Sequence, residues 1–229
     1  MAQLKVRQIR AGSPQHAYPR LRGPGLWQSF VHAWSGLIHT VAYQRNMRIH
    51  IISAILVGLV GMGIPLGLAE KVTLIFCVLL IFFAEILNSA LEHLVDLAVQ
   101  EVHEHARDTK DAAAAGVLVL AIGTVVIFAA LLIHNWEVVA GHIPEIRRQV
   151  LLGLPLAATA ALLMMDRPKP AALDIGLFLV GCGLLAALAV WSQSYVFTSM
   201  TLGLLVVAAD SARLRRKLGA AAQQERLSS

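Results

Sequence analysis

Residues Val72 to Asp96 read VTLIFCVLLIFFAEILNSALEHLVD, an apolar run in which a ladder of polar side chains begins at Glu85. The run carries no charge before Glu85, and a carboxylate this close to hydrocarbon is rare and usually functional. The ladder continues through Asn88, Glu92 and Asp96, and on a helix these four side chains fall within about 80° of one another. One helix face therefore carries three carboxylates and an amide, turned away from lipid, and this is a donor set for a cation.

The composition is that of a membrane protein. Of the 229 residues, 57% are hydrophobic and only 14% are charged, whereas soluble domains carry about 25% charged residues. A bilayer-spanning helix needs about 20 apolar residues. Six segments meet this need and are predicted to cross the membrane: 48–66, 71–98, 111–133, 149–165, 172–191 and 195–210.

An amphipathic helix is predicted before the first span, over about residues 25–45. Its apolar side chains recur every three or four residues: Leu26, Phe30, Trp34, Leu37 and Val41. Such a helix is suited to lie in the plane of the membrane interface. The alternative is a core helix of a soluble domain, although the chain offers no soluble core for it to join.

The distribution of Lys and Arg predicts the orientation. With six spans and the N-terminus inside, 16 of the 19 basic residues fall on the cytoplasmic side, as the positive-inside rule requires. Both termini are therefore expected in the cytoplasm. The net charge of +5 then reports topology and attraction to anionic lipid, and it gives no support for a nucleic-acid partner.

Three segments bring polar residues to the cytoplasmic end of the second span, where its ladder lies. The loop at 99–110 supplies Arg107 and Lys110, and Asp111 opens the third span. Small residues at 112–116 allow helices to approach closely there, which would bring Lys110 and Asp111 against the ladder. The first span begins at the same depth with Gln44, Arg45 and Asn46, followed by Arg48.

This inventory suits ATP. Carboxylates hold Mg²⁺ through oxygen, Lys and Arg bind phosphates, and one carboxylate is left to take a hydroxyl proton. Phosphoryl transfer needs mostly positioning and neutralisation of charge. The phosphate-binding pattern GxxxxGK[ST] does not occur in the sequence, so nothing in it resembles a P-loop.

The quoted residues resemble the prokaryotic diacylglycerol kinase family. The resemblance covers about residues 25–133, and three stretches carry it: residues 85–96, then His103, Arg107 and Lys110–Ala113, and finally residues 45–50, which are similar to the undecaprenol-kinase branch. It implies an integral-membrane lipid kinase with a surface helix and three spans, forming a homotrimer with shared active sites. It also implies ATP and Mg²⁺ as substrate and cofactor, and diacylglycerol or undecaprenol as the lipid.

The resemblance also implies roles for individual residues. Carried over by position, it assigns the catalytic base to Glu85 and ordering of the site to Asn88, metal binding to Glu92 and Gln44, nucleotide binding to Arg45, Asp96, Arg107, Lys110 and Asp111, and contact with the lipid substrate to Trp34 and Arg48.

Two features depart from the family pattern. Gln44 stands where the family usually has a second metal-binding Glu, and an amide donates a neutral oxygen without charge. Residues 134–210 have no counterpart in the family: they are expected to add three spans with a packing or lipid-facing role, followed by a basic cytoplasmic tail at 211–229. A basic tail is likewise expected at 1–24.

The sequence thus predicts an all-α, polytopic protein of the bacterial inner membrane, with an N-terminal interfacial helix and about six transmembrane helices. Its first half is interpreted as an ATP- and Mg²⁺-dependent lipid kinase. Two alternatives stay open: a transporter or channel that uses the intramembrane carboxylates, and an inactive assembly protein derived from a kinase.

Overall fold

The computed structural model describes residues 25–99, 101, 103–166 and 169–228, so the basic tail expected at 1–24 lies outside the described residues. Within these ranges the fold is all-helical, as predicted. Its eight helices are α1 (Leu26–Tyr43), α2 (Arg45–Met62), α3 (Leu68–Ala98), α4 (Glu104–His134), α5 (Trp136–Gly141), α6 (Ile143–Leu163), α7 (Ala171–Ala189) and α8 (Tyr195–Ser228).

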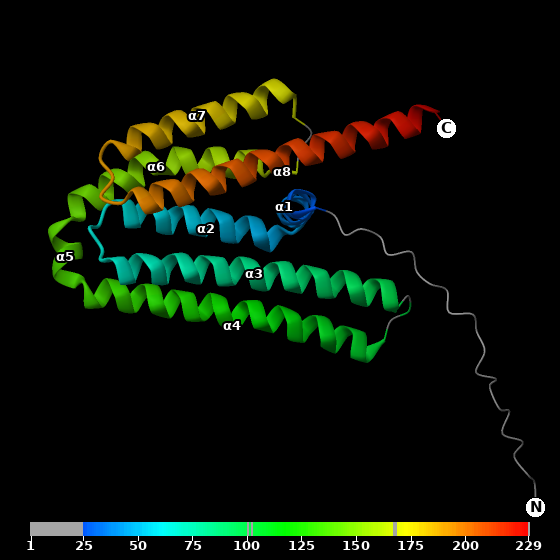
Figure 1. The fold of residues 1–229 in the computed structure, drawn as a ribbon, viewed down its shortest axis with the longest axis horizontal. Helices are drawn as coiled ribbons and strands as arrows, with labels where there is room; N and C mark the ends of the chain where they lie inside the picture. Colours follow the sequence, from blue (N-terminus) through cyan, green and yellow to red (C-terminus); the bar gives the residue numbers. More distant parts are fainter. Residues whose placement is uncertain (1–24, 100, 102, 167–168, 229) are drawn as a thin grey trace, which may run out of the picture.

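The helices form two groups that meet at α2. Figure 1 shows α2, α3 and α4 lying lengthwise on one side, and α6, α7 and α8 lying lengthwise on the other. Helix α1 is seen end-on, so it lies across the others at one end of the bundle. We call this end the α1 end and the opposite one, where α5 lies, the α5 end. Helices α3, α6 and α8 run toward the α1 end, and α2, α4 and α7 begin there.

Six of the helices are long and apolar enough to cross a membrane, which confirms the predicted spans in number and order. They are α2, α3, α4, α6, α7 and the part of α8 up to Ala221. Helix α8 does not end near residue 210 but continues through the segment expected as a basic tail. The short helix α5 was not predicted.

The largest buried cluster lies between the two groups of helices. Side chains of α2, including Met47, Ile51, Ile55 and Leu59, are fully buried and pack in one cluster with residues of α6, α7 and α8. The family-like segment and the following helices therefore share one hydrophobic core.

Close approach in this core depends on glycines. A Cβ built on Gly61 of α2 would lie 2.5 Å from two ring carbons of Phe197 in α8, and a Cβ on Gly153 of α6 would lie 2.3 Å from Leu59 Cδ2. Small residues of this kind let membrane helices approach each other closely. Packing of α2 against α6 and α8 is therefore specific.

Gly61→Leu is expected to destabilise the folded protein by at least about 1–3 kcal/mol, because its side chain would overlap the ring of Phe197 in a packed core. Thermal unfolding in detergent, followed by circular dichroism, measures the change. Gly123→Leu is the matched control, since nothing lies within 4 Å of a Cβ at Gly123 in α4. Equal loss of stability in both variants would contradict the packing described.

Candidate active site

The polar ladder of α3 continues its buried apolar stripe. Leu74, Cys77, Val78 and Ile81 are buried at helical spacing, and Glu85 follows on the same face. Glu85 is 1% exposed. The structure therefore shows the predicted orientation for Glu85, whose side chain points into the protein.

The ladder becomes more exposed toward the α1 end. Asn88 is 5% exposed, Glu92 is half-buried and Asp96 is exposed. The Asn88 Nδ2 group donates a hydrogen bond to Glu92 Oε1 over 3.0 Å. This contact orients both side chains and links the buried part of the ladder to its solvated part.

Glu85 and Asn88 line a cavity of about 230 Å³ between α2, α3 and α4. Helix α2 contributes Asn46, Ile49 and His50 to it, and α4 contributes Ala114, Val117, Leu118 and Ala121. Neither carboxylate oxygen of Glu85 has a hydrogen-bond partner among the described residues, nor has Asn88 Oδ1. A buried polar group without a partner is costly, so these oxygens are poised for a ligand.

His50 and Asn46 were not predicted as site residues. The structure places both in the wall of the Glu85 cavity. Their spacing of four residues sets them on one face of α2. That spacing was the available signal, but nothing in the sequence indicated which face of α2 meets α3.

At the solvated end, Lys110 lies against the ladder as predicted. Its Nζ atom is 2.5 Å from Asp96 Oδ1, and this ion pair joins the start of α4 to the end of α3. Asp111 instead pairs with Arg107, 3.6 Å away and one helical turn back, and both of these side chains are exposed. The structure therefore brings Lys110, but not Asp111, into contact with the ladder.

The remaining predicted residues lie in α1, at the corner between α1 and α2, and in the first turns of α2. Gln44 is the single residue between the two helices, and its backbone N–H donates to Thr40 O over 2.8 Å. Arg45 is exposed. Arg48 turns toward the second group of helices and is 2.6 Å from Asp166. Trp34 Nε1 donates to Asp210 Oδ2 over 3.1 Å.

The donor set fits Mg²⁺ in kind. Carboxylate and amide oxygens are the ligands this ion takes, and it commonly uses one or two carboxylates together with substrate phosphates and water. Within the described ranges, no group of three or more His, Cys, Asp or Glu residues is placed to hold a metal ion. The chain by itself thus offers a partial set, which phosphate oxygens would complete.

Comparisons with known proteins match the same part of the chain. A family model described as prokaryotic diacylglycerol kinase matches residues 31–132. A diacylglycerol kinase of Synechocystis is 39% identical over 111 residues, which are 48% of this chain and 63% of that protein, less than two thirds of its length. No solved structure matches.

Two further relatives are covered more completely. An undecaprenol kinase of Bacillus subtilis is 36% identical over 96 residues, covering 42% of this chain and 78% of the relative. A diacylglycerol kinase of Escherichia coli is 31% identical over 101 residues, covering 44% of this chain and 83% of the relative. The resemblance seen in the sequence is confirmed: the chain is a multi-pass membrane protein that belongs to the prokaryotic diacylglycerol kinase family of lipid kinases.

Proposed function

We propose that this protein transfers the γ-phosphate of ATP to the hydroxyl of a membrane lipid, diacylglycerol or undecaprenol, with Mg²⁺ bound. Relatives named for either lipid are similar to this chain at comparable identity. Family membership supports the kinase class, and the site geometry supports the roles below.

The buried Glu85 carboxylate carries the proposal. It is 1% exposed, borders a cavity, and has no described donor on either oxygen. A general base must be within hydrogen-bond reach of the proton it takes. A lipid hydroxyl in this cavity would donate to Glu85. As its oxygen bonds to the γ-phosphorus, the proton passes to Glu85, the bond to the β,γ-bridging oxygen breaks, and ADP leaves.

Residues at the solvated end of the ladder would bind the phosphates of the nucleotide. Lys110 is held there by Asp96, and Arg107, Asp111 and Arg45 are exposed at the same end. We assign these five residues to the nucleotide. Charge neutralisation dominates phosphoryl transfer, so cations beside the carboxylates are what the reaction needs.

Glu92 and Gln44 are the residues proposed to hold Mg²⁺, which when bound would neutralise charge on the ATP phosphates. Asn88 orients the Glu92 carboxylate through the 3.0 Å hydrogen bond. A metal ligand fixed in this way by a neighbour binds its ion more tightly. Asn88 thus orders the site without carrying charge.

The lipid would approach along α1. The first turns of this helix expose a run of large apolar side chains, with Leu26 at 94% exposure and Trp27 and Phe30 also exposed. Such a surface suits the membrane interface. We also propose that both termini are cytoplasmic. We further propose a homo-oligomer, because α4 exposes most of its apolar side chains, and these would contact lipid or a second copy.

A transporter is less well supported by the geometry. The ladder of α3 lies at one end of the helix, and from Val72 to Ala84 the helix carries no charge. An ion path would need ionisable groups across the membrane. The other alternative, an inactive assembly protein derived from a kinase, rests on Gln44 alone.

An assay of purified protein with labelled ATP and each of the two lipids, run side by side, tests which lipid is phosphorylated. We expect label to enter at least one of the two lipids in a Mg²⁺-dependent way, with undecaprenol favoured by the similarity of residues 45–50 to that branch. Incorporation into neither lipid would refute the proposed activity.

Gln44→Glu is expected to lower the Mg²⁺ concentration that gives half-maximal activity, because it adds a negative charge at a proposed ligand position. A Mg²⁺ titration of the initial rate measures this. Gln193→Glu, in the turn before α8 at the α5 end, is the control for a general charge effect. An unchanged or higher requirement would remove Gln44 from the metal site.

A further inference from the structure

We propose that α6–α8 act as a brace that holds the α1–α2 corner in place for catalysis, with Asp166, Arg215 and Asp210 as positioning residues. This rests on the proposed function for its effect on activity, whereas the holding of the corner can be measured without any reaction. No role for these helices follows from the family match, which ends at residue 132.

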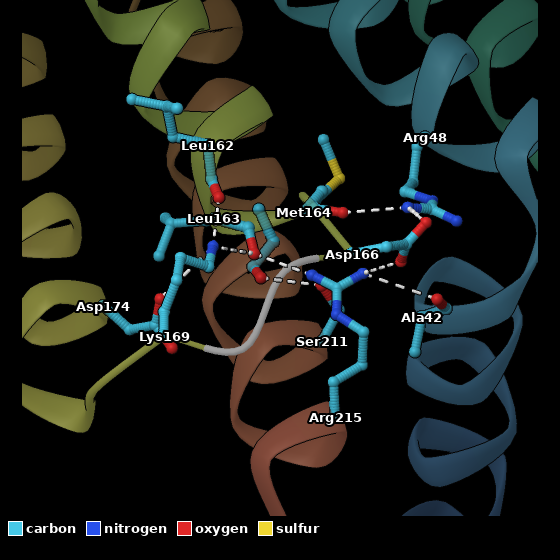
Figure 2. Close-up of polar contacts among 11 residues, drawn as sticks. Ala42, Arg48, Leu162, Leu163, Met164, Asp166, Lys169, Asp174, Ser211 and Arg215 are labelled. Carbon is cyan, nitrogen blue, oxygen red and sulfur yellow. Dashed lines mark hydrogen bonds and ion pairs between the residues drawn. The ribbon is translucent and has the colours of Figure 1, made fainter. Parts of the chain in front are cut away.

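One carboxylate joins the two groups of helices. Asp166 follows α6 and accepts from Arg48 of α2 at 2.6 Å and from Arg215 of α8 at 3.4 Å, through its two different oxygens. Figure 2 shows the two guanidinium groups converging on it from opposite sides. Both arginine side chains are only 15% exposed, whereas Asp166 itself is 62% exposed, so solvent and salt reach these ion pairs from the carboxylate side and screen them in part.

The same cations satisfy the end of α6. The last carbonyls of a helix lack partners within it, and here Arg48 donates to Met164 O at 3.0 Å and Arg215 to Leu163 O at 2.7 Å. Lys169 donates to Leu162 O and, at 3.3 Å, to Leu163 O. Cations at a helix C-terminus are also favoured by its dipole.

Asp174 extends the cluster to α7. It is 4% exposed, and it lies 3.4 Å from Lys169 and 2.8 Å from Arg216 of α8. Burial lowers the pKa of the Lys169 ammonium below its usual range, and the nearby Asp174 carboxylate opposes this. A packing or lipid-facing role was expected for the spans after residue 134, to which Asp174 belongs. In the structure it is a buried anion that ties α7 to α8.

Helix α8 reaches α1 at two points. Arg215 Nη1 donates to Ala42 O in the last turn of α1 at 3.4 Å, and Asp210 accepts from Trp34 Nε1 two turns earlier at 3.1 Å. Two contacts about 12 Å apart along α1 fix its direction as well as its position. They hold the segment that ends at Gln44.

The corner matters because α2 carries part of the catalytic cavity from its first turns. Asn46 and His50 face Glu85 across that cavity, and Arg48, held by Asp166, lies between them in sequence. A rotation of α2 that frees Arg48 would therefore also move Asn46 and His50. Removing Asp166 leaves two guanidinium groups side by side without their shared carboxylate, which favours such a movement.

The experiment measures the corner directly. Spin labels at exposed Ser35 in α1 and exposed Lys217 in α8, with Cys77 and Cys182 replaced by alanine, report the α1–α8 distance by pulsed electron resonance. We expect one narrow distribution in the parent protein and a broadened one in Asp166→Asn. Asp166→Glu should restore the narrow distribution. Glu137→Gln, an exposed carboxylate at the α5 end, is the matched control.

Kinetics supply the second readout. Asp166→Asn should raise the KM for lipid by about tenfold, the effect of one charge-assisted hydrogen bond, with a smaller change in kcat. Asp210→Ala, which frees only α1, should raise the same KM and serves if Asp166→Asn fails to fold. Unchanged distance distributions in both variants would overturn the brace. A parent protein that is inactive but whose distances respond as expected would refute the kinase and leave the brace standing.

Discussion

Glu85→Gln is expected to reduce lipid phosphorylation by about 10²–10⁴-fold, which is the usual contribution of a general base. The amide keeps the size of the side chain but cannot take the hydroxyl proton. Because Glu85 has no described hydrogen-bond partner, the substitution breaks no internal contact, and the protein should insert and fold as before. Initial rates with saturating ATP and lipid measure the effect.

Glu70→Gln provides the control for Glu85. Glu70 lies in the first turn of the same helix, at the α5 end, so the substitution removes an identical charge far from the cavity. Its turnover should stay within about twofold of the parent rate, the scale of a surface substitution. Near-normal turnover in Glu85→Gln would remove this residue from the mechanism.

Glu92→Gln is expected to have the second-largest effect, a rise of about 10²-fold in the Mg²⁺ concentration for half-maximal activity. Loss of one charge a few ångströms from a divalent ion costs about 1–4 kcal/mol or more at protein surfaces. The amide can still accept the hydrogen bond from Asn88, which separates loss of charge from loss of order. A Mg²⁺ titration at fixed ATP measures the shift.

Glu92→Gln could also shift the Mg²⁺ requirement through the general electrostatic field, without any loss of metal coordination, and a control separates the two effects. Glu104→Gln removes an exposed carboxylate from the first turn of α4, at the same end of the bundle, and should shift the Mg²⁺ requirement little. Equal shifts in the two variants would show that Glu92 acts only through the general field. Q44E and E92Q combined should show partial compensation if both side chains serve one ion.

The sequence was sufficient for the features that depend on local periodicity. The stripe from Leu74 to Ile81 and the ladder beginning at Glu85 share one helical face, so the inward direction of Glu85 followed from spacing alone. The helix before residue 45 and the six long apolar helices were predictable for the same reason. Membership of the family followed from residue types at fixed spacing in three segments.

What the sequence could not supply depends on how helices pair. Nothing in the pattern around Asn46 and His50 says that this face of α2 meets α3 while Met47 and Ile51 meet α6 and α8. Asp174 is an isolated acid in an apolar span, and its partners Lys169 and Arg216 lie in separate segments. Three basic residues of α8 beyond residue 210 pair with Asp166, Asp174 and Asp210, and the sequence pattern alone did not indicate these partners.

This arrangement gives the second group of helices a structural reason to be joined to the segment that matches the family. Helix α2 is shared between the Glu85 cavity and the core formed with α6 and α8. Displacement of the brace therefore reaches the cavity through a single rigid helix. A truncation after α4 would expose the fully buried α2 side chains Met47 and Leu59, and point variants of the brace are the cleaner test.

Transfer of the labelled γ-phosphate of ATP into extracted lipid, compared between the parent protein and Glu85→Gln, decides whether Glu85 serves lipid phosphorylation. We expect labelled lipid that requires both Mg²⁺ and an added lipid alcohol, and its near-complete loss in the variant. ATP hydrolysis without labelled lipid, or equal labelling by the two proteins, would contradict it.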